Sequence, residues 1–483
     1  MDPIFGFPIV LPPPGTRERL RALHGQLHAA ILDGRLKPGL RLPATRELAE
    51  ALQISRNTVV AAYDLLLSEG YVIARRGAGN YVADLLARHG HGRALSRHAD
   101  MQRRLAPYWR ESAGAHSLAR QVSSPQDFRL GIPDNRQFPF EVWRRLSARA
   151  LRDLSKAAPV YGPAEGRPVL REAIARHVSF ARAVACQADD VIVTSGAQQA
   201  FDLLARVLVT PGQTTLAMED PGYPPLRAAF TAAGANVVAV PVDDEGLVVE
   251  QLPASTQVIY VTPSHQFPLG MPLSPRRRTA LLAFAQAHNA TIIEDDYDGE
   301  FRYGGRPLDA LQTLDRHGSV CYVGTFSKCL FPTLRLGYVV APPWLHPALA
   351  EAKQLSDWHC DVVAQDTLAA FIAEGHLVRH VRKMHKVYAQ RRAALLHALA
   401  SYGGSAVQVL PSDAGLHLAA LLPSTVEIDR MIERAAEEGI QLEGLGGYAV
   451  GALVPHGLAF GFGTVDVRYI DEAVRRVMLW VGE

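Results

Sequence analysis

The sequence predicts a multidomain protein, with a small helical N-terminal domain that ends in a β-hairpin and a larger α/β body. Three observations predict this fold class. The chain has 483 residues, which is too long for one ordinary core. Helical apolar patterns and a hairpin fill residues 15–83. From residue 127 to residue 483, apolar strands alternate with amphipathic helices, which is typical of a parallel sheet covered by helices.

Composition narrows the class of protein without naming a function. The net charge is +2, so any affinity for nucleic acid must come from a local concentration of basic residues. The 4 cysteines show neither metal-binding spacing nor the density of a disulfide framework, which favours a reducing cytoplasm. The N-terminus is apolar but lacks a basic start, and no apolar run has the length of a membrane helix. We expect a cytoplasmic protein without a membrane segment.

The N-terminal domain is expected to hold three helices and a two-stranded wing. Residues 17–32 carry leucines at helical spacing, residues 45–52 follow a short loop, and Ser55 is a natural N-cap for a helix over residues 56–67. Strand-like runs at 71–74 and 80–82 flank Arg75, Arg76 and Gly77. The third helix is polar at its start and apolar later, as in a helix that enters a DNA groove by its N-terminus. A small helical bundle without a DNA role would show the same spacing.

Residues 84–126 are rich in arginine and histidine and lack apolar periodicity, so they are expected to form a linker. In the body, strands are expected at 191–193, 215–218, 237–240, 258–261, 292–294 and 320–323. After Gly337, a long helix over 377–400 and short strands near 415–421 and 457–462 predict a smaller C-terminal α+β part.

Lys328 is the residue around which the candidate site of the body is organised. It follows directly after the strand at 320–323, and ligands bind at this end of the strands in open α/β sheets. A partly desolvated lysine there can form a Schiff base. Thr325 and Arg335 would offer a hydroxyl and a fixed charge to a phosphate. This is the arrangement that pyridoxal 5'-phosphate (PLP) requires, although a surface lysine after a strand is the simpler alternative.

Other strand ends supply the remaining groups of such a site. Asp295 ends a strand and would keep the PLP ring nitrogen protonated, and Tyr297 would contact the ring hydroxyl. A turn at Gly196 opens a helix whose first N–H groups can receive an anion. Tyr223, after another strand, would stack on the cofactor. Each signal alone also fits an ordinary loop or turn.

The order of these motifs resembles the fold-type I PLP-dependent aminotransferases. The resemblance implies that Lys328 is the Schiff-base lysine, that Asp295 faces the pyridine nitrogen, and that Tyr223 stacks on the ring. It also implies a phosphate site made of Gly196, Ala197, Gln198, Thr325 and Arg335. Tyr161 is similar to the tyrosine of that family that reaches the phosphate from the partner subunit, which implies a homodimer.

Residues 15–83 closely resemble the winged helix of GntR-type transcription regulators, through the runs Leu42-Pro-Ala-Thr-Arg46 and Ile54-Ser-Arg56-Asn57-Thr58. The resemblance implies that the DNA contacts come from Arg46, Ser55, Arg56, Asn57 and Thr58, with Arg76 and Gly77 in or beside the minor groove.

A winged helix joined to an aminotransferase-like body is similar to the MocR subfamily of those regulators. The run Ser264-His265-Gln266 is a further agreement and implies that His265 lies near the ring hydroxyl, although a loop histidine with satisfied hydrogen bonds is an alternative. The resemblance implies a dimeric, PLP-dependent regulator that binds double-stranded DNA at two half-sites and senses a small amine, an amino acid or PLP itself. A working aminotransferase that also binds DNA, and a repressor without cofactor, are the alternatives.

Little or no transaminase turnover is expected. Aminotransferases of the family that this chain resembles hold the substrate carboxylate with an arginine about two dozen residues before the C-terminus. A guanidinium suits this task because it can bind a carboxylate through two hydrogen bonds. The matching run in this chain has Ala459 at that place, and Arg227 is a weak substitute.

Overall fold

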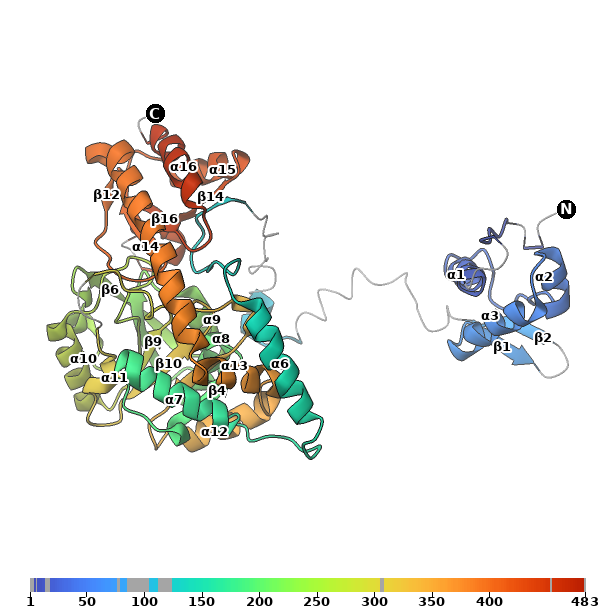
Figure 1. Ribbon diagram of the computed structural model, residues 1–483, viewed down its shortest axis with the longest axis horizontal. Helices are drawn as coiled ribbons and strands as arrows, with labels where there is room; N and C mark the ends of the chain where they lie inside the picture. The colour runs from blue at the N-terminus through green and yellow to red at the C-terminus, as the bar shows by residue number, and fades with distance from the viewer. Residues whose placement is uncertain are drawn as a thin grey trace. The chain divides into compact units, whose positions relative to one another are not determined.

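The computed structural model describes residues 4–5, 7–13, 18–75, 79–84, 104–111, 124–304, 308–451 and 454–481. The chain forms two compact units, residues 1–113 and residues 114–483, and each is described by itself (Figure 1). Arg76 and Gly77, predicted to lie at the DNA, fall outside the described residues.

The N-terminal unit has the predicted three helices and hairpin. Its elements are α1 (Glu18–Leu32), α2 (Thr45–Ala51), α3 (Arg56–Ser68), β1 (Val72–Arg75) and β2 (Gly79–Val82). The two strands pair antiparallel. Leu23 and Leu27 of α1, Leu48 of α2, and Val59 and Leu66 of α3 are fully buried in one core. These apolar positions recur at helical spacing, so one core fixes how the three helices cross.

A segment before α1 also packs on this core. Phe5, Phe7, Ile9 and Leu11 are partly buried against it. The backbone N–H of Val10 donates to the Gln26 side chain at 2.9 Å, and the Gln26 amide donates back to the Val10 carbonyl at 2.6 Å. The apolar N-terminus therefore covers the winged helix, although it lies outside the predicted range of residues 15–83.

The body is built on an eight-stranded sheet in the order β4-β11-β10-β9-β8-β5-β6-β7. The strands are β4 (Val191–Thr194), β5 (Thr215–Asp220), β6 (Asn236–Asp243), β7 (Gly246–Leu247), β8 (Val258–Val261), β9 (Thr291–Asp296), β10 (Val320–Thr325) and β11 (Gly337–Val340). Neighbouring residues such as Ile259 and Tyr260 lie in different apolar clusters, because successive side chains of a strand point to opposite faces.

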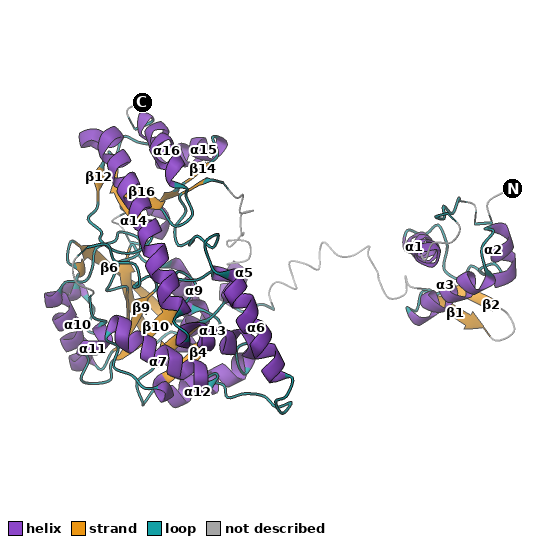
Figure 2. Cartoon of the chain, in the orientation of Figure 1, coloured by secondary structure: helices purple, strands orange, loops and turns teal. Residues whose placement is uncertain are grey.

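Helices cover both faces of the sheet (Figure 2). They are α6 (Phe140–Leu154), α7 (Pro168–Arg182), α8 (Ala197–Leu208), α9 (Pro224–Ala232), α10 (Pro275–His288), α11 (Leu311–Leu314), α12 (His346–Asp357) and α13 (Val362–Ala373). Among the described helices, none is both long enough and apolar enough to cross a membrane.

The sheet is mixed, whereas the alternation of strands and helices predicted a parallel one. β11 pairs antiparallel with both β10 and β4. Only Phe326 to Leu336 separate β10 from β11. That connection is too short for the helical crossover that a parallel pair needs, so the chain turns back along its neighbour. The turn is the segment that carries Lys328.

The C-terminal part is an α+β layer, as predicted. It contains α14 (His376–Gly403), α15 (Ile428–Glu437), α16 (Val467–Leu479) and a sheet of β12 (Gln408–Val409), β13 (His417–Leu421), β16 (Gly457–Gly461) and β15 (Glu443–Gly444). β14 (Ile440–Gln441) pairs with β3 (Gln126–Asp127), which follows the linker and its short helix α5 (Pro107–Glu111). The first segment of the body is therefore tied to the C-terminal layer.

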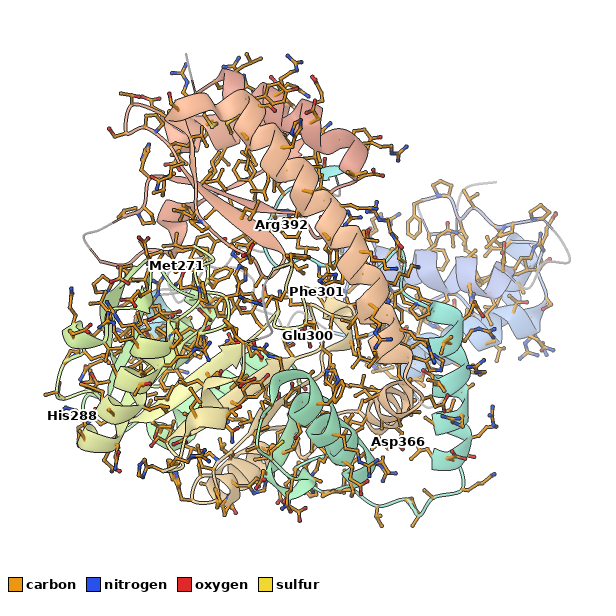
Figure 3. All side chains as sticks on the ribbon, turned by 60° about the vertical axis from the view of Figure 1, so that its left-hand side comes forward. Met271, His288, Glu300, Phe301, Asp366 and Arg392 are labelled. Atoms are coloured by element: carbon orange, nitrogen blue, oxygen red, sulfur yellow. The ribbon has the colours of Figure 1, made fainter. Side chains whose placement is uncertain are left out.

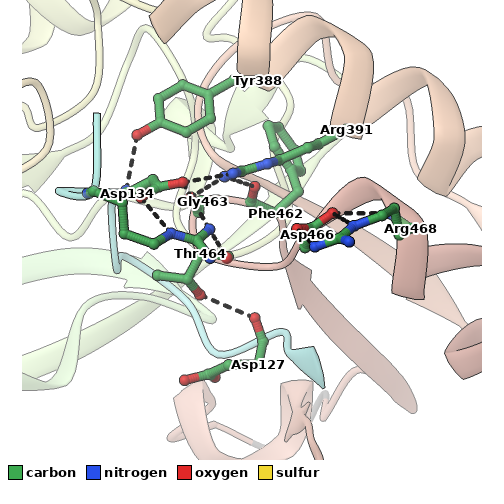
Figure 4. A network of polar contacts seen from close by, with 10 residues as sticks. Asp127, Asp134, Tyr388, Arg391, Phe462, Gly463, Thr464, Asp466 and Arg468 are labelled. Atoms are coloured by element: carbon green, nitrogen blue, oxygen red, sulfur yellow. Dashed lines mark hydrogen bonds and ion pairs between the residues drawn. The ribbon is translucent and has the colours of Figure 1, made fainter. Parts of the chain in front are cut away.

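A buried ion pair fastens that segment to α14 (Figure 4). Asp134 accepts from Arg391 of α14 at 2.6 Å and from the Arg136 guanidinium, and its backbone N–H donates to the Tyr388 hydroxyl at 3.0 Å. The Arg391 guanidinium also donates to the Gly463 carbonyl after β16. Although burial alone would raise the pKa of Asp134, hydrogen bonds from Arg136 and Arg391 bring it to about 2.

We predict that Asp134→Ala lowers the free energy of unfolding of the body by about 3–5 kcal/mol, because it leaves the buried Arg391 without its carboxylate. Asp466→Asn is the matched control, since Asp466 pairs with the exposed Arg468 and an asparagine still caps α16. The control should change stability by less than about 1 kcal/mol in urea unfolding.

The same pair predicts a dependence on pH. The folded pKa of Asp134 lies below the ordinary value, so its contribution to stability is complete above about pH 4 and is lost as pH falls toward about 2. Asp134→Ala should lose this part of the acid dependence. An equal loss of stability in both variants would contradict the assigned role.

Candidate cofactor and DNA-binding sites

Lys328 lies in a cavity at the carboxyl end of the central strands. Its Nζ donates to the carbonyl of Gly131 at 2.6 Å, and a Cβ added to Gly131 would lie 2.7 Å from that nitrogen. Burial lowers the pKa of Lys328 below its ordinary value, although Asp298 and Asp295 act in the opposite direction. An amine with a lowered pKa is more often neutral and therefore nucleophilic.

Asp295 lines the same cavity and has one free oxygen. Its Oδ2 accepts from the Tyr260 hydroxyl at 2.7 Å, whereas its buried Oδ1 has no hydrogen-bond partner among the described residues. Burial raises the pKa of Asp295 to about 7. A buried carboxylate oxygen without a donor is costly, so this oxygen is suited to a protonated ligand nitrogen.

The half-buried Tyr297 and the buried His265 form a hydrogen-bonded group beside Asp295. His265 Nδ1 lies 2.9 Å from both the Tyr297 hydroxyl and Asp298 Oδ2, and its Nε2 lies 3.1 Å from the Ser412 hydroxyl. Because a carboxylate only accepts, we assign the hydrogen to Nδ1 and the acceptor role to Nε2. Burial, Asp298 and Asp295 raise the pKa of Tyr297 well above its ordinary value, so the phenol keeps its proton as a donor.

The other polar residues of the run 264–266 are also used inside the protein. The Ser264 hydroxyl accepts from Arg182 at 2.6 Å, and the Gln266 amide donates to the carbonyls of Pro221 and Phe267 at 2.8 and 2.7 Å. The run therefore fixes the loop around His265. His265 itself does not line the cavity and reaches it through Tyr297.

The predicted phosphate residues meet at the start of α8. Gly196 has a φ of 77° just before the helix, and a Cβ there would lie 3.0 Å from both terminal nitrogens of Arg335. Arg335 donates to the Ser195 carbonyl at 2.9 Å, and the Thr325 hydroxyl donates to that of Ser327 at 3.0 Å. Backbone N–H groups, hydroxyls and a guanidinium thus converge where an oxyanion can bind.

Several further side chains complete the wall of the cavity. Tyr223 lies at the N-terminus of α9, and burial raises its pKa to about 12. The predicted residues that line the cavity are Ala197, Gln198, Tyr223, Asp295, Tyr297, Thr325, Lys328 and Arg335. The cavity wall also contains Gly131, Tyr260, Phe267, Asp298, Ser327, Pro332, Leu416 and His417.

The structure does not bring every predicted residue to this cavity. Tyr161 is 73% exposed and its ring lies 4.5 Å from that of Trp358, away from the cavity within one chain. Arg227 of α9 does not line the cavity, although its buried Nη1 lacks a partner among the described residues. Ala459 is buried in β16 against Leu445 and Met271 and does not reach the cavity either.

Sequence reasoning missed the residues that support the predicted ones. Tyr260 holds Asp295, yet it reads as one more apolar residue of a buried strand. Its distinguishing signal is a hydroxyl among the aliphatic residues of Val258–Val261. Asp298 and Ser412 hold His265 but come from separate parts of the chain, 33 and 147 positions away from it.

The predicted DNA residues lie at the N-terminal ends of α2 and α3. Arg46, Ser55, Arg56 and Asn57 are exposed. The Ser55 hydroxyl accepts from the Thr58 backbone N–H at 3.1 Å, as expected for an N-cap. Arg56 donates to the Thr45 hydroxyl at 3.4 Å, so the starts of both helices lie together. In the hairpin, the Arg75 guanidinium lies 4.6 Å from the centre of the Tyr81 ring.

The residues of the body cavity fit PLP. The cavity holds a buried carboxylate oxygen without a donor among the described residues, which suits a protonated ring nitrogen, and a lysine of lowered pKa. An arginine and a helix start also meet at this cavity and suit the phosphate. When bound, PLP supplies an aldehyde and an electron-withdrawing ring.

Comparisons with known proteins match both units. Residues 21–82 match the model of bacterial regulatory proteins of the gntR family, and residues 125–447 match the aminotransferase class I and II model. The chain is 36% identical to the probable rhizopine catabolism regulatory protein MocR of Rhizobium meliloti, over 94% of this chain and 92% of that protein. It is 32% identical to the pyridoxine biosynthesis transcriptional regulator PdxR of Corynebacterium glutamicum, over 95% of both chains.

The fold of the body has solved relatives. The structure is similar to Pyrococcus horikoshii kynurenine aminotransferase, with a TM-score of 0.72 and 28% sequence identity. The match covers 80% of this chain and 98% of that one.

We predict that Lys328→Ala abolishes the visible absorption of lysine-bound PLP but leaves the far-ultraviolet circular dichroism unchanged. We expect this lysine to form the covalent link, and in the structure its amine makes one hydrogen bond, to a carbonyl. Lys386→Ala, an exposed lysine of α14, is the control and should keep the full band. A persistent band in Lys328→Ala would assign the link to another residue.

We further predict that Asp295→Ala keeps PLP attached but shifts its absorption band, because the charge opposite the ring nitrogen is gone. Tyr260→Phe should shift the band less, since it removes a partner of Asp295 and leaves the carboxylate in place. An equal spectrum for wild type and Asp295→Ala would show that Asp295 does not face the ring.

Proposed function

The chain belongs to the MocR-type regulators of the gntR family, and we propose that its PLP-binding body senses a small amine, an amino acid or PLP itself and thereby changes how a homodimer holds DNA. One observation carries this proposal. A chain with a winged helix holds a lysine of lowered pKa and a carboxylate with a free oxygen in one cavity of its body. A domain that served only to dimerise would have no use for either.

The winged helix is the DNA-binding part, and its residue roles are part of the proposal. Arg46, Arg56 and Asn57 are exposed at two helix starts, where guanidinium and amide groups suit phosphates and base edges. Ser55 and Thr58 fix the first turn of α3 and hold these groups in register. Arg75 at the wing suits the phosphate backbone. DNA as the partner also implies a cytoplasmic location.

We propose a homodimer through Tyr161. An aromatic side chain that is 73% exposed and lies next to exposed Val160 and Trp358 is unusual on a free surface. In the proposed dimer, the Tyr161 hydroxyl reaches the phosphate site of the partner subunit. Two subunits carry two winged helices, so the operator consists of two half-sites.

The body residues perform distinct tasks toward the bound cofactor. Lys328 would supply the amine that holds the cofactor's aldehyde carbon, and Lys328 would be released as a free amine if an amine of the effector took that carbon. Asp295 holds a proton at the ring nitrogen, and Tyr297 donates to the ring hydroxyl oxygen, with His265 and Asp298 fixing its direction. Arg335 and the start of α8 hold the phosphate. Release of Lys328 would change the contacts around its amine, and this would give the two states that regulation needs.

We propose that turnover is slow. Among the described residues of the cavity wall, Arg335 is the sole arginine, and it lies at the phosphate end. Neither Ala459 nor Arg227 provides a clamp for a carboxylate in this cavity. Without a clamp, the Cα–H bond of an amino acid is not held perpendicular to the ring, and a positioning effect of several kcal/mol is lost, on the order of what orientation supplies in enzymes.

A working aminotransferase is the second candidate. Lysine, aspartate and arginine are all present, and the body resembles a solved aminotransferase. The two candidate functions differ in what happens to an amine after it binds. A regulator keeps the amine bound, whereas an aminotransferase converts it to a keto compound.

We predict that Arg56→Ala lowers affinity for the operator by about 1–3 kcal/mol for each lost base contact, and much less for unrelated DNA. Arg75→Ala should weaken binding to all DNA alike and reduce the salt slope by about 1. Arg21→Ala, an exposed arginine of α1, is the control. Footprinting measures the protected bases, and protection of a single half-site by a monomer would contradict the dimer.

We predict that amines and amino acids shift the visible band of the PLP form, while keto-acid release stays below one equivalent per subunit over the assay. Lys328→Ala is the control for non-specific release. Rapid multiple turnover with any common α-amino acid would favour the enzyme instead.

A further inference from the structure

A second cavity lies where the large sheet part meets the C-terminal layer. Its volume is about 320 Å³. Figure 3 labels Arg392, which belongs to α14, and Phe301, the residue before Arg302. The polar residues of its wall are Ser264 and Arg302 from the large part, and Arg392, Ser412 and Asp413 from the C-terminal layer. It is separate from the PLP cavity, with which it shares no lining residue.

Arg302 brings to this cavity a guanidinium that forms no direct ion pair with a described residue. Its backbone is fixed, because it bridges to Ala414 and its carbonyl accepts from His385 Nε2 at 2.7 Å. Its guanidinium forms no ion pair with a described residue, and its buried Nε lacks a partner. Burial lowers the pKa of Arg302, although Asp413 acts against this. A partly buried cation without an anion costs free energy that a bound anion would recover.

Arg392 adds a second incompletely used guanidinium. It donates to the Ser412 carbonyl and to Asp413 at 2.9 Å, and it lies 5.5 Å from the centre of the Tyr303 ring. Among the described residues, its buried Nε also has no partner. Two arginines and one aspartate leave an excess of positive charge in the cavity wall. The two guanidiniums come from different parts of the body, so an anion between them would hold those parts together.

A chain of hydrogen bonds leads from this cavity to the PLP site. Ser412 lies in the cavity wall, and its hydroxyl is 3.1 Å from His265 Nε2. His265 Nδ1 is 2.9 Å from the Tyr297 hydroxyl, which lines the PLP cavity. Gly270 allows the close approach of Ser412, since a Cβ there would lie 2.8 Å from Ser412 Cβ. A shift of the loop at Ser412 therefore changes the support of Tyr297.

We propose that this second cavity binds a small oxyanion, a carboxylate or a phosphate, between Arg302 and Arg392, and that its occupancy is relayed through Ser412 and His265 to the PLP site. The binding goes beyond the proposed sensing of an amine, because it uses other residues. Of the two parts of this proposal, anion binding and relay, only the relay requires PLP to be bound in the first cavity.

Binding is tested on the full chain loaded with PLP, so that the phosphate site near Arg335 is filled. Inorganic phosphate and acetate are titrated by calorimetry and by thermal unfolding at constant ionic strength, with chloride as the reference. We expect phosphate or acetate, but not chloride, to raise the Tm of the wild type, and the stronger of the two identifies the natural chemistry. In Arg302→Gln the affinity should fall at least about tenfold, while the Tm without anion stays the same or rises.

Arg382→Gln is the matched control, since Arg382 is an exposed arginine on the same helix as Arg392. It should bind the anion like the wild type. Equal stabilisation by chloride, or equal affinity in Arg302→Gln and wild type, would overturn the site. A lower Tm of Arg302→Gln without anion, with unchanged anion affinity, would make Arg302 structural and would also overturn it.

The relay is tested with Ser412→Ala. The anion should still raise the Tm of this variant, but the change in the visible band that it causes in the wild type should disappear. A band change that persists in Ser412→Ala, or the absence of one in the wild type, would overturn the relay. Loss of PLP itself is recognised separately, because the visible band is then missing before any anion is added.

Discussion

The body depends on how it accommodates four carboxylates buried at the end of β9. Glu294, Asp295, Asp296 and Asp298 are 0%, 4%, 7% and 2% exposed. Carboxylates this deep must be paired, protonated or bound to a ligand, because their desolvation is otherwise prohibitive. Strand alternation divides them between the two faces of the sheet, since Glu294 and Asp296 share one side and Asp295 points to the other. The carboxylates on the two faces of the sheet are stabilised in different ways, and this difference defines the cofactor site.

On the structural side, every acid has protein donors. Glu294 accepts from the backbone N–H groups of Leu311 and Gln312 at 2.7 and 2.8 Å, at the start of α11. Asp296 accepts from Arg182 at the end of α7 and from the Tyr322 hydroxyl, both at 2.6 Å. These bonds fix two helices and a neighbouring strand against β9. On the other side, Asp295 has one oxygen held and one free, so the same strand that stabilises the fold offers a charge to a ligand.

His265 connects this strand end to the rest of the body. It contacts Tyr297 and Asp298 after β9 and Ser412 before β13, which belong to different layers. The ring is therefore one of the contacts through which a change in one layer can act on the other. Regulation needs two arrangements with different contacts, and a single buried histidine between two layers provides a place where they can differ.

The sequence by itself determined the winged helix, the order of strands and helices and the chemistry at strand ends. These follow from periodicity and from residue types at fixed local spacing, as in the Ser55 cap or in Lys328 and Asp295 directly after strands. Such signals are local, so the helices of the first unit could be placed to within a residue or two.

Only the tertiary structure decided which distant residues meet. The Gly131 carbonyl bound by Lys328 is 197 positions away, and Ser412 is 147 positions from His265. The antiparallel pairing of β11 and the exposure of Tyr161 could not be predicted from the sequence either. A hydrogen bond between two distant segments produces no periodic pattern in the sequence of either segment. It is created when the whole core brings two layers together, and therefore only the folded chain shows it.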